Sequence, residues 1–345
     1  MPTASSSNAA LTILSVLALL WSAYVGSAFL APLTLSVFLV ALIWPIQVAL
    51  CAWIPKALAV IITFLLLAAL IVLLSSVTLW ALESIWQTLN SNVQRYQAMY
   101  QSFADWLEKN DIIIAGLWAD TFNVNWMLRF LQQMLARTGQ TVSFWAVTIA
   151  YVLTALVEVE HMEGSIVKYC GPAVAATVHA GLAETARKLR LYMGVRAVVS
   201  LVTGLTITLI AFAVGLPLAV EWGVLGFVLN FIPFLGPLIA TFIPALFALA
   251  HVGDPVFALL LFALLTVLQF LGGSYMEPRF SGGALRLSPF VILMTIFLWT
   301  CIWGIYGTFI GVPIVIAIAA FANHIPSWRW LLGFLGADEA AGDAQ

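Results

Sequence analysis

Residues 221–245, EWGVLGFVLNFIPFLGPLIATFIPA, decide how this chain folds. The stretch is apolar enough to lie in a bilayer, but Pro233, Gly236 and Pro237 interrupt it in the middle. A proline inside a helix removes a backbone donor and clashes with the preceding turn. Within lipid, backbone that is broken in this way persists only where protein or a wet cavity surrounds it. The stretch therefore predicts either two half-helices that line a polar path or one span that is kinked at its prolines.

The composition of the whole chain places it in a membrane. Of its 345 residues, 63% are hydrophobic and only 8% are charged, whereas soluble domains carry about 25% charged residues. The formal net charge is -2 and no long basic run occurs, so a nucleic-acid partner is not expected. The first ten residues carry no Lys or Arg, which favours a retained first span over a cleaved secretory signal. The sequence predicts a polytopic protein embedded in a lipid bilayer.

Six apolar runs have the length of about 20 residues that a helix needs to cross the hydrocarbon core. They cover residues 11–30, 33–54, 57–82, 141–157, 191–214 and 256–274, with a boundary expected at Pro32 between the first two. Each run predicts one whole transmembrane helix.

Two further apolar runs, 218–250 and 290–321, are too long for one comfortable span and too short for two. The second is interrupted by Gly304, Gly307 and Pro313. Each run is predicted to form a broken re-entrant hairpin that follows a whole span. Two such units of opposite orientation would form the inverted-repeat-like transport core that many secondary transporters share. The predicted fold is an all-α polytopic membrane protein with about six full spans and two broken hairpins.

The chain divides into regions by composition. A three-span region (1–82), a charged surface segment (83–140), a fourth span with a cytoplasmic polar linker (141–190), the transport core (191–323) and a short polar tail (324–345) follow one another. The segment 83–140 is interpreted as amphipathic helices on the membrane surface or as a small helical cap packed on itself. With both termini inside, nine basic residues fall on the inner side and four on the outer side. This asymmetry predicts cytoplasmic termini.

The uncharged amides of Asn230 and Gln269 are candidate ligands for a polyhydroxylated solute, because each offers donors and an acceptor without charge. A helix–helix hydrogen bond, worth about 0.6 kcal/mol in membranes, is the alternative role for either amide. Gly236, Gly304 and Gly307 are expected to permit close backbone approach and positive φ. The predicted substrate path comprises Asn230, Pro233, Gly236, Pro237, Gln269, Gly304, Gly307 and Pro313.

Three charged residues near segment ends are candidates for gating or for structural contacts. They are Glu221, Glu277 and Arg279, the last two forming either a salt-bridged corner or a gate around Pro278. No carboxylate lies in the middle of a span, which disfavours a proton relay at the membrane midplane. No catalytic motif and no His/Cys ligand cluster occurs, so neither an enzyme nor a metal or other cofactor is expected.

Three segments carry a family resemblance: LNFIPFLGPLIATFIPA (229–245), MEPRFSGGALRLSPFVI (276–292) and WTCIWGIYGTFIGVPIVI (299–316). In order and spacing they resemble the bacterial autoinducer-2 exporter family of permeases. The resemblance implies an inner-membrane homo-oligomer, namely a pentamer, whose hairpins carry substrate. The sequence departs from the family pattern at Phe234, where relatives often have Asn, and at Gly283, where many have a basic residue.

The expected function is transport of a small polar solute by alternating access. The resemblance implies export of autoinducer-2 or a similar polyhydroxylated metabolite. A sodium or lithium/proton antiporter, as in other members of the family, is the alternative. A membrane scaffold that binds partner proteins without transporting a solute is the second alternative.

Overall fold

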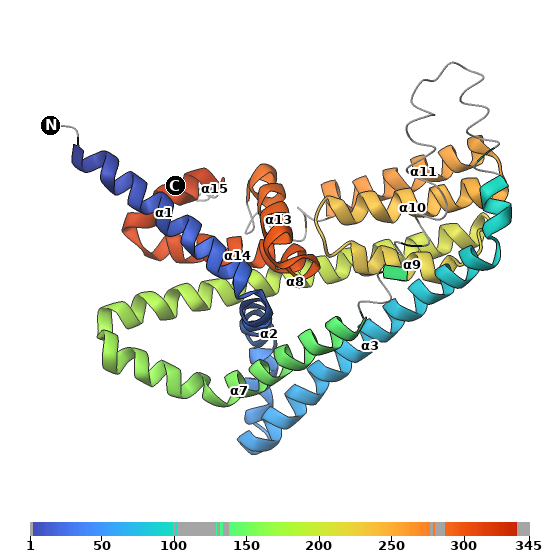
Figure 1. Cartoon of the computed structure of the whole chain (residues 1–345). Helices are drawn as coiled ribbons and strands as arrows, with labels where there is room; N and C mark the ends of the chain where they lie inside the picture. The colour runs from blue at the N-terminus through green and yellow to red at the C-terminus, as the bar shows by residue number, and fades with distance from the viewer. Residues whose placement is uncertain are drawn as a thin grey trace. The chain divides into compact units, whose positions relative to one another are not determined.

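Every regular element in the described part of the chain is helical. The computed structural model describes residues 3–98, 138–276 and 287–336, together with residues 101, 129, 132, 133 and 279. Within these ranges no strand occurs, and seven helices are long and apolar enough to cross a membrane. Figure 1 shows the order of the helices along the chain. The prediction of an all-α polytopic membrane protein is confirmed.

The helices follow one another in a simple order. They are α1 (Thr3–Val25), α2 (Ser27–Cys51), α3 (Lys56–Ser91), α7 (Thr138–Cys170), α8 (Pro172–Ala213), α9 (Ala219–Leu229), α10 (Leu235–Val252), α11 (Pro255–Phe270), the π-helix η1 (Leu271–Met276), α13 (Pro289–Trp303), α14 (Ile305–His324), the 3-10 turn η2 (Pro326–Trp328) and α15 (Trp330–Leu335). The span-length helices are α2, α3, α7, α8, α10, α11 with the start of η1, and α14. Each of the two broken apolar runs thus contributes one short helix, α9 or α13, and one helix of span length.

Two predicted boundaries of the first three spans differ from the structure. The division between the first two spans lies at Gly26, and the predicted boundary at Pro32 is wrong, because Pro32 lies inside α2. Proline has no backbone N–H, so α2 lacks one of its internal hydrogen bonds there. Transmembrane helices tolerate this loss when neighbouring groups compensate. The third helix, α3, continues past the predicted end at residue 82 to Ser91. Most of the segment 83–140 lies outside the described residues.

The helix α8 is twice as long as a membrane is thick. Its 42 residues extend over about 63 Å at 1.5 Å per residue, against about 30 Å for the hydrocarbon core. The helix begins directly after Gly171, whose φ of 81° ends α7, and Pro172 occupies its first position. The predicted fifth span, 191–214, is the apolar second half of this helix. The polar first half, from Pro172 to Arg190, continues it without a break.

The chain forms two compact units, and each contains one of the broken helix pairs. The first unit comprises residues 1–68, 143–192 and 283–345, and the second comprises 69–142 and 193–282. In the first unit α14 packs along α13 and also contacts α2 and α15. The rings of Phe144 and Tyr306 stack there with their centroids 3.5 Å apart.

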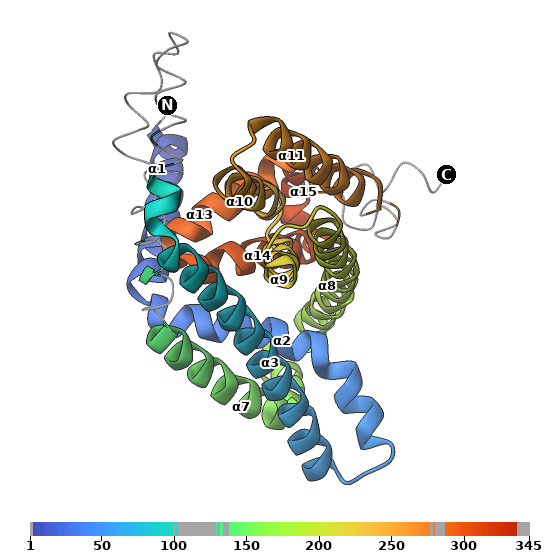
Figure 2. The ribbon, with the colours of Figure 1, turned by 90° about the vertical axis from the view of Figure 1, so that its right-hand side faces the viewer.

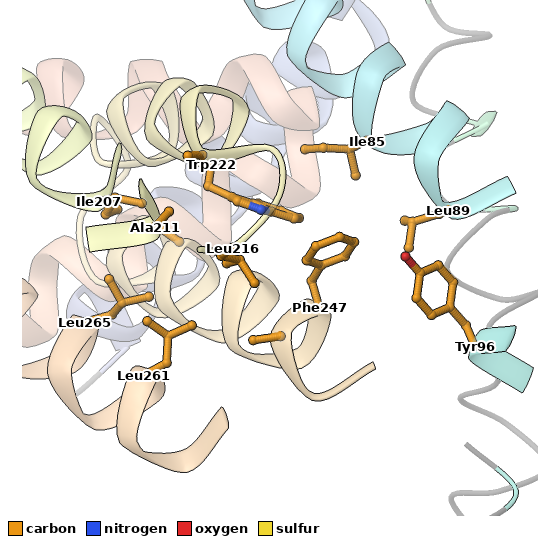
Figure 3. Close-up of a cluster of buried hydrophobic side chains, with 13 residues drawn as sticks. Ile85, Leu89, Tyr96, Ile207, Ala211, Leu216, Trp222, Phe247, Leu261 and Leu265 are labelled. Carbon is orange, nitrogen blue, oxygen red and sulfur yellow. The ribbon is translucent and has the colours of Figure 1, made fainter. Parts of the chain in front are cut away.

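In the second unit α10 packs between α9 and α11, as the view in Figure 2 shows. A cluster of buried apolar side chains fills this unit (Figure 3). Trp222 and Phe247 lie at its centre with ring centroids 5.1 Å apart, and Tyr96 packs on Phe247 at 6.2 Å. The indole N–H of Trp222 donates to the carbonyl of Pro217 at 3.0 Å. Because the polar edge of this tryptophan is satisfied, its full burial carries no cost in unpaired hydrogen bonds.

Candidate functional site

The interrupted stretch 221–245 forms two separate helices that fold back on one another. Residues 230–234 connect α9 to α10. Trp222 near the start of α9 contacts Phe247 near the end of α10, so the two helices run in opposite directions. The interpretation as one kinked span is therefore wrong for this structure. The connection begins earlier than the predicted junction at 233–237, since Gly236 and Pro237 already belong to the first turn of α10.

The connection contains a strained residue at its tip. Phe234 has φ 62° and ψ -54°, and the N–H of Leu235 donates to the carbonyl of Pro233 at 2.7 Å. These angles and this hydrogen bond across one residue define a γ-turn with positive φ, which is rare and strained. The expectation that Gly236 supplies the positive φ is wrong, because Gly236 is helical and the positive φ at the tip falls on Phe234.

Gly236 serves instead for close approach between the two helices. A Cβ atom built on Gly236 would lie 1.8 Å from the carbonyl oxygen of Leu229 and 3.2 Å from the backbone nitrogen of Asn230. No side chain fits into that space. The first turn of α10 therefore packs directly on the last turn of α9.

Two residues of α8 hold the end of α9. Asn230 is 2% exposed, and its side-chain amide donates to the hydroxyl of Ser200 at 3.2 Å. Its backbone carbonyl accepts a long hydrogen bond of 3.5 Å from the guanidinium of Arg196, which is itself 7% exposed. A cation at the end of a helix complements the partial negative charge of its free carbonyls. The guanidinium of Arg196 thus provides a hydrogen-bond donor for the backbone carbonyl of Asn230, which the helix break would otherwise leave without one.

The second pair, α13 and α14, breaks at a single residue. Gly304 has φ 61° and ψ -140°, in a region open essentially to glycine alone. Its expected positive φ is confirmed. Gly307 is helical, so its expected positive φ is wrong, but its expected close approach is confirmed, since a Cβ on it would lie 1.8 Å from the carbonyl oxygen of Trp299 in the preceding helix. The hydroxyls of Thr300 and Thr308 lie 2.8 Å apart across the break.

The two breaks share one structural feature, a close backbone contact at a glycine, which no common sequence motif predicts. Gly236 and Gly307 each lie in the first turn of a second helix and rest on the last turn of the first. The motif WGxxG occurs twice in the sequence, at 222–226 in α9 and at 303–307 around the start of α14. The copy in α9 has another role. A Cβ on Gly223 would lie 1.8 Å from the hydroxyl of Thr208, and one on Gly226 would lie 2.5 Å from Ile207. These two glycines let α9 pack closely on α8, as small residues do between membrane helices.

The other predicted site residues fall in different places. Pro233 is buried in the connection, and Pro313 is buried inside α14 without breaking it. Gln269 is buried near the end of α11 and lines a cavity. Glu221 lies in the first turn of α9, at the opposite end of that helix from Asn230, so the structure does not bring it to the tip.

The predicted charged corner is only partly covered by the structure. Glu277 lies outside the described residues, and Arg279 is described with an exposed side chain. No group of three or more His, Cys, Asp or Glu side chains within the described ranges could hold a metal ion.

Sequence reasoning missed Arg196, Ser200, Thr300 and Thr308. The signal for Arg196 was present, because it is a cation within the predicted span 191–214, and ionisable residues within membrane helices are functional candidates by default. The two threonines and the serine carry no such signal. Hydroxyl residues in transmembrane helices commonly bond to their own backbone, and Thr300 also does so, to the carbonyl of Ile296 at 2.6 Å.

Comparison with known proteins identifies the family of the chain. The profile of the AI-2E family transporter matches residues 13–327. The AI-2 transport protein TqsA of Escherichia coli is 25% identical over 295 residues, which cover 85% of each chain. A predicted transport protein of Borreliella burgdorferi is 31% identical over 149 residues, 43% of this chain and 41% of that protein. The second alignment thus spans less than half of the relative. The family match covers nearly the whole described region, and the chain belongs to the AI-2E family of transporters, as a multi-pass membrane protein.

Proposed function

We propose that this transporter moves a small polar solute by alternating access around its two broken helix pairs. The observation that carries the proposal is the repeated break: each compact unit holds one pair, closed at its tip by a glycine in backbone contact. Interrupted helices in corresponding parts of two repeats mark the substrate site of many secondary transporters. A broken helix leaves backbone polar groups and short polar side chains available to a solute at its tip. In an unbroken helix the backbone groups are used in the helix's own hydrogen bonds.

We infer that the pairs are re-entrant hairpins in units of opposite orientation. The contact between Trp222 and Phe247 supports this for the first pair, because it brings the start of α9 near the end of α10. Both ends of the pair would then reach the same membrane face. The imbalance of basic residues supports cytoplasmic termini in a bacterial inner membrane. We propose a homo-oligomeric assembly on the strength of the family resemblance alone.

The solute that the first tip favours is uncharged or anionic. The guanidinium of Arg196 lies at the end of α9, where it donates to the carbonyl of Asn230, and a guanidinium also suits the oxygen acceptors of a hydroxylated or anionic solute. This favours autoinducer-2 or a similar polyhydroxylated metabolite over a sodium or lithium ion. The relationship to TqsA, a transport protein for AI-2, supports the same choice. Export is the direction that the resemblance implies.

The deciding experiment measures solute flux in proteoliposomes. Vesicles loaded with autoinducer-2 should release it faster with the protein than without it, and Gly236→Leu should abolish the difference because its side chain cannot fit at the tip. Gly194→Leu is the matched control, since no atom lies within 4 Å of a Cβ at that position. Release at the wild-type rate by Gly236→Leu would remove the tip from the solute path, and no release by the wild type would support a scaffold.

The orientation is tested by labelling single cysteines in a background without Cys51, Cys170 and Cys301. Cysteines at positions 56 and 187 should react from the cytoplasmic side. Cysteines at 217 and 254, which flank the first pair, should both react from the outer side. Reaction of 217 and 254 from opposite sides would show that α9 and α10 together cross the membrane.

A further inference from the structure

A cavity of about 200 Å³ lies between α8 and the junction of α11 with η1, within the second unit. Its wall is mostly apolar, and none of the lining residues that the structure describes is ionisable. The lining residues are Val202, Thr203, Thr206, Ile207, Leu265, Leu268, Gln269, Leu271, Gly272 and Met276. A cavity of comparable size, about 150 Å³, admits a benzene molecule when its lining is apolar. The space therefore suits a small organic molecule.

The cavity has one polar group that lacks a partner. Gln269 is 9% exposed, and its Nε2 atom makes no hydrogen bond within the described structure. A buried donor that is left unpaired costs about 1–3 kcal/mol. Such a group is normally satisfied by a ligand or by ordered water. The side-chain amide of Gln269 is thus a hydrogen-bond donor that a ligand with an oxygen acceptor would satisfy.

Two hydroxyl groups and an irregular helical turn complete the polar part of the wall. The hydroxyl of Thr206 donates to the carbonyl of Val202 at 2.7 Å, which leaves its lone pairs available as acceptors. Thr203 lines the cavity beside Gly272, where a Cβ would lie 3.7 Å from the threonine hydroxyl. The lining residues Leu271, Gly272 and Met276 belong to the π-helix η1. The π-helix continues α11 directly, and single π-turns within α-helices occur often at functional sites.

The chemistry of the wall selects among ligands. An ion would find no counter-charge among the described lining residues, which is costly at low dielectric. Water alone would satisfy Gln269, but a cavity of this size holds several waters, and most of them would face apolar side chains. A molecule with one oxygen acceptor and an apolar body satisfies both parts of the wall.

We propose that this cavity binds a small uncharged amphiphile, with an oxygen acceptor on the amide of Gln269 and an apolar body against α8 and α11. The site is distinct from the tip of α9, although α8 serves both. Ser200 contacts Asn230, whereas Thr203, one turn further along α8, faces the cavity. The proposal concerns binding and does not rest on transport, so its failure would leave the transport proposal untouched.

The test uses the purified full-length protein in detergent, without its three native cysteines, and a reporter cysteine at Thr206→Cys. Benzyl alcohol is the probe, toluene has the same body without an oxygen, and benzoate carries a charge. Benzyl alcohol should slow alkylation of the reporter about tenfold at ten times its Kd. Toluene should protect more weakly, and benzoate should not protect. A second reporter, Leu209→Cys on an exposed face of the same helix, should be unaffected and controls for uptake of the probes by the micelle.

Paired glycine variants separate the cavity from its surroundings. Gly272→Val should fill the cavity and abolish protection, because a Cβ there has room, at ordinary contact distances from Thr203 and Val199. Gly273→Val should retain protection, because a Cβ at that exposed position meets no atom within 4 Å. Gln269→Leu should lose the preference for benzyl alcohol over toluene.

Three results would overturn the proposal. The first is a reporter that no probe protects. The second is equal protection by toluene and benzyl alcohol in the unaltered cavity. The third is protection that is already present without a probe and disappears on removal of lipid, since this would assign the cavity to a bound lipid. A melting temperature measured for each variant ensures that only folded proteins are compared.

Discussion

Gly236 rests on the carbonyl oxygen of Leu229 so closely that a Cβ on the glycine would lie 1.8 Å from that oxygen. Gly307 stands in the same relation to Trp299, also at 1.8 Å. Both contacts join the first turn of one helix to the last turn of the helix before it. The close packing of each broken pair therefore depends on a single missing side chain, and both positions exclude every other amino acid at the observed backbone positions.

The smallest substitution at this contact should already separate the helices. In Gly236→Ala the added methyl group would overlap with the carbonyl oxygen of Leu229, so the backbones of α9 and α10 must move apart. We expect a loss of about 1–3 kcal/mol in the free energy of unfolding and a clear loss of flux. Thermal unfolding and proteoliposome release measure the two effects. Gly194→Ala, whose Cβ meets no atom within 4 Å, should be neutral in both. Equal behaviour of the two variants would show that the tip adjusts without cost.

Relief of strain at the tip should stabilise the protein. Phe234 holds a positive φ in its γ-turn while its side chain is 48% exposed, so its removal sacrifices little packing. Phe234→Gly should raise the free energy of unfolding by about 1 kcal/mol. Phe242→Gly serves as the comparison, since Phe242 is 52% exposed but helical, and the same substitution there should destabilise by about 1 kcal/mol. A loss of stability in Phe234→Gly would show that this ring makes contacts that outweigh the strain.

The amide of Asn230 has two candidate roles, and a double-mutant cycle separates them. If it serves only the hydrogen bond to Ser200, Asn230→Ala and Ser200→Ala should show a coupling of about 0.6 kcal/mol in stability and equal effects on flux. If it also binds solute, Asn230→Ala should weaken solute affinity by roughly 1–3 kcal/mol while Ser200→Ala leaves the affinity nearly unchanged. Flux at several solute concentrations gives the affinity. The second outcome is the one that the proposed function requires.

The buried Arg196 should tolerate neither removal nor exchange for lysine. Arg196→Met removes the donor to the carbonyl of Asn230, and Arg196→Lys keeps the charge without the reach of the guanidinium. We expect both to lower stability by about 1–3 kcal/mol, the cost of a buried acceptor left unpaired. Arg187→Met, on an exposed position of the same helix, should change stability by less than about 0.5 kcal/mol. A neutral Arg196→Met would show that the end of α9 finds another donor.

The interruption of the stretch 221–245 was predictable because proline and glycine act locally on the backbone, whatever the tertiary context. The details were not. The strained position falls on Phe234, and no rule of residue preference would assign a positive φ to a phenylalanine. The first helix boundary is a second example of a detail that the sequence did not predict. Pro32 lies inside α2, and the boundary lies at Gly26.

The candidate site was predictable only where its residues lie on the broken segments themselves. Asn230, Gly236 and Gly307 stand beside a visible interruption. Their partners Arg196 and Ser200 are 34 and 30 residues from Asn230 in the chain, on a helix whose packing no local pattern reveals. The repeated WGxxG letters show the converse, since identical motifs serve helix crossing in α9 and hairpin closure around α14.

The shortness of α9 also constrains how the protein is made. Its 11 residues extend over about 16 Å, roughly half of the hydrocarbon thickness. As it emerges from the ribosome, α9 alone has too little length to settle across the bilayer as an independent insertion unit. A stable position in the bilayer therefore depends on α10, against which α9 packs closely at Gly236. We expect α9 to insert together with α10 and not ahead of it.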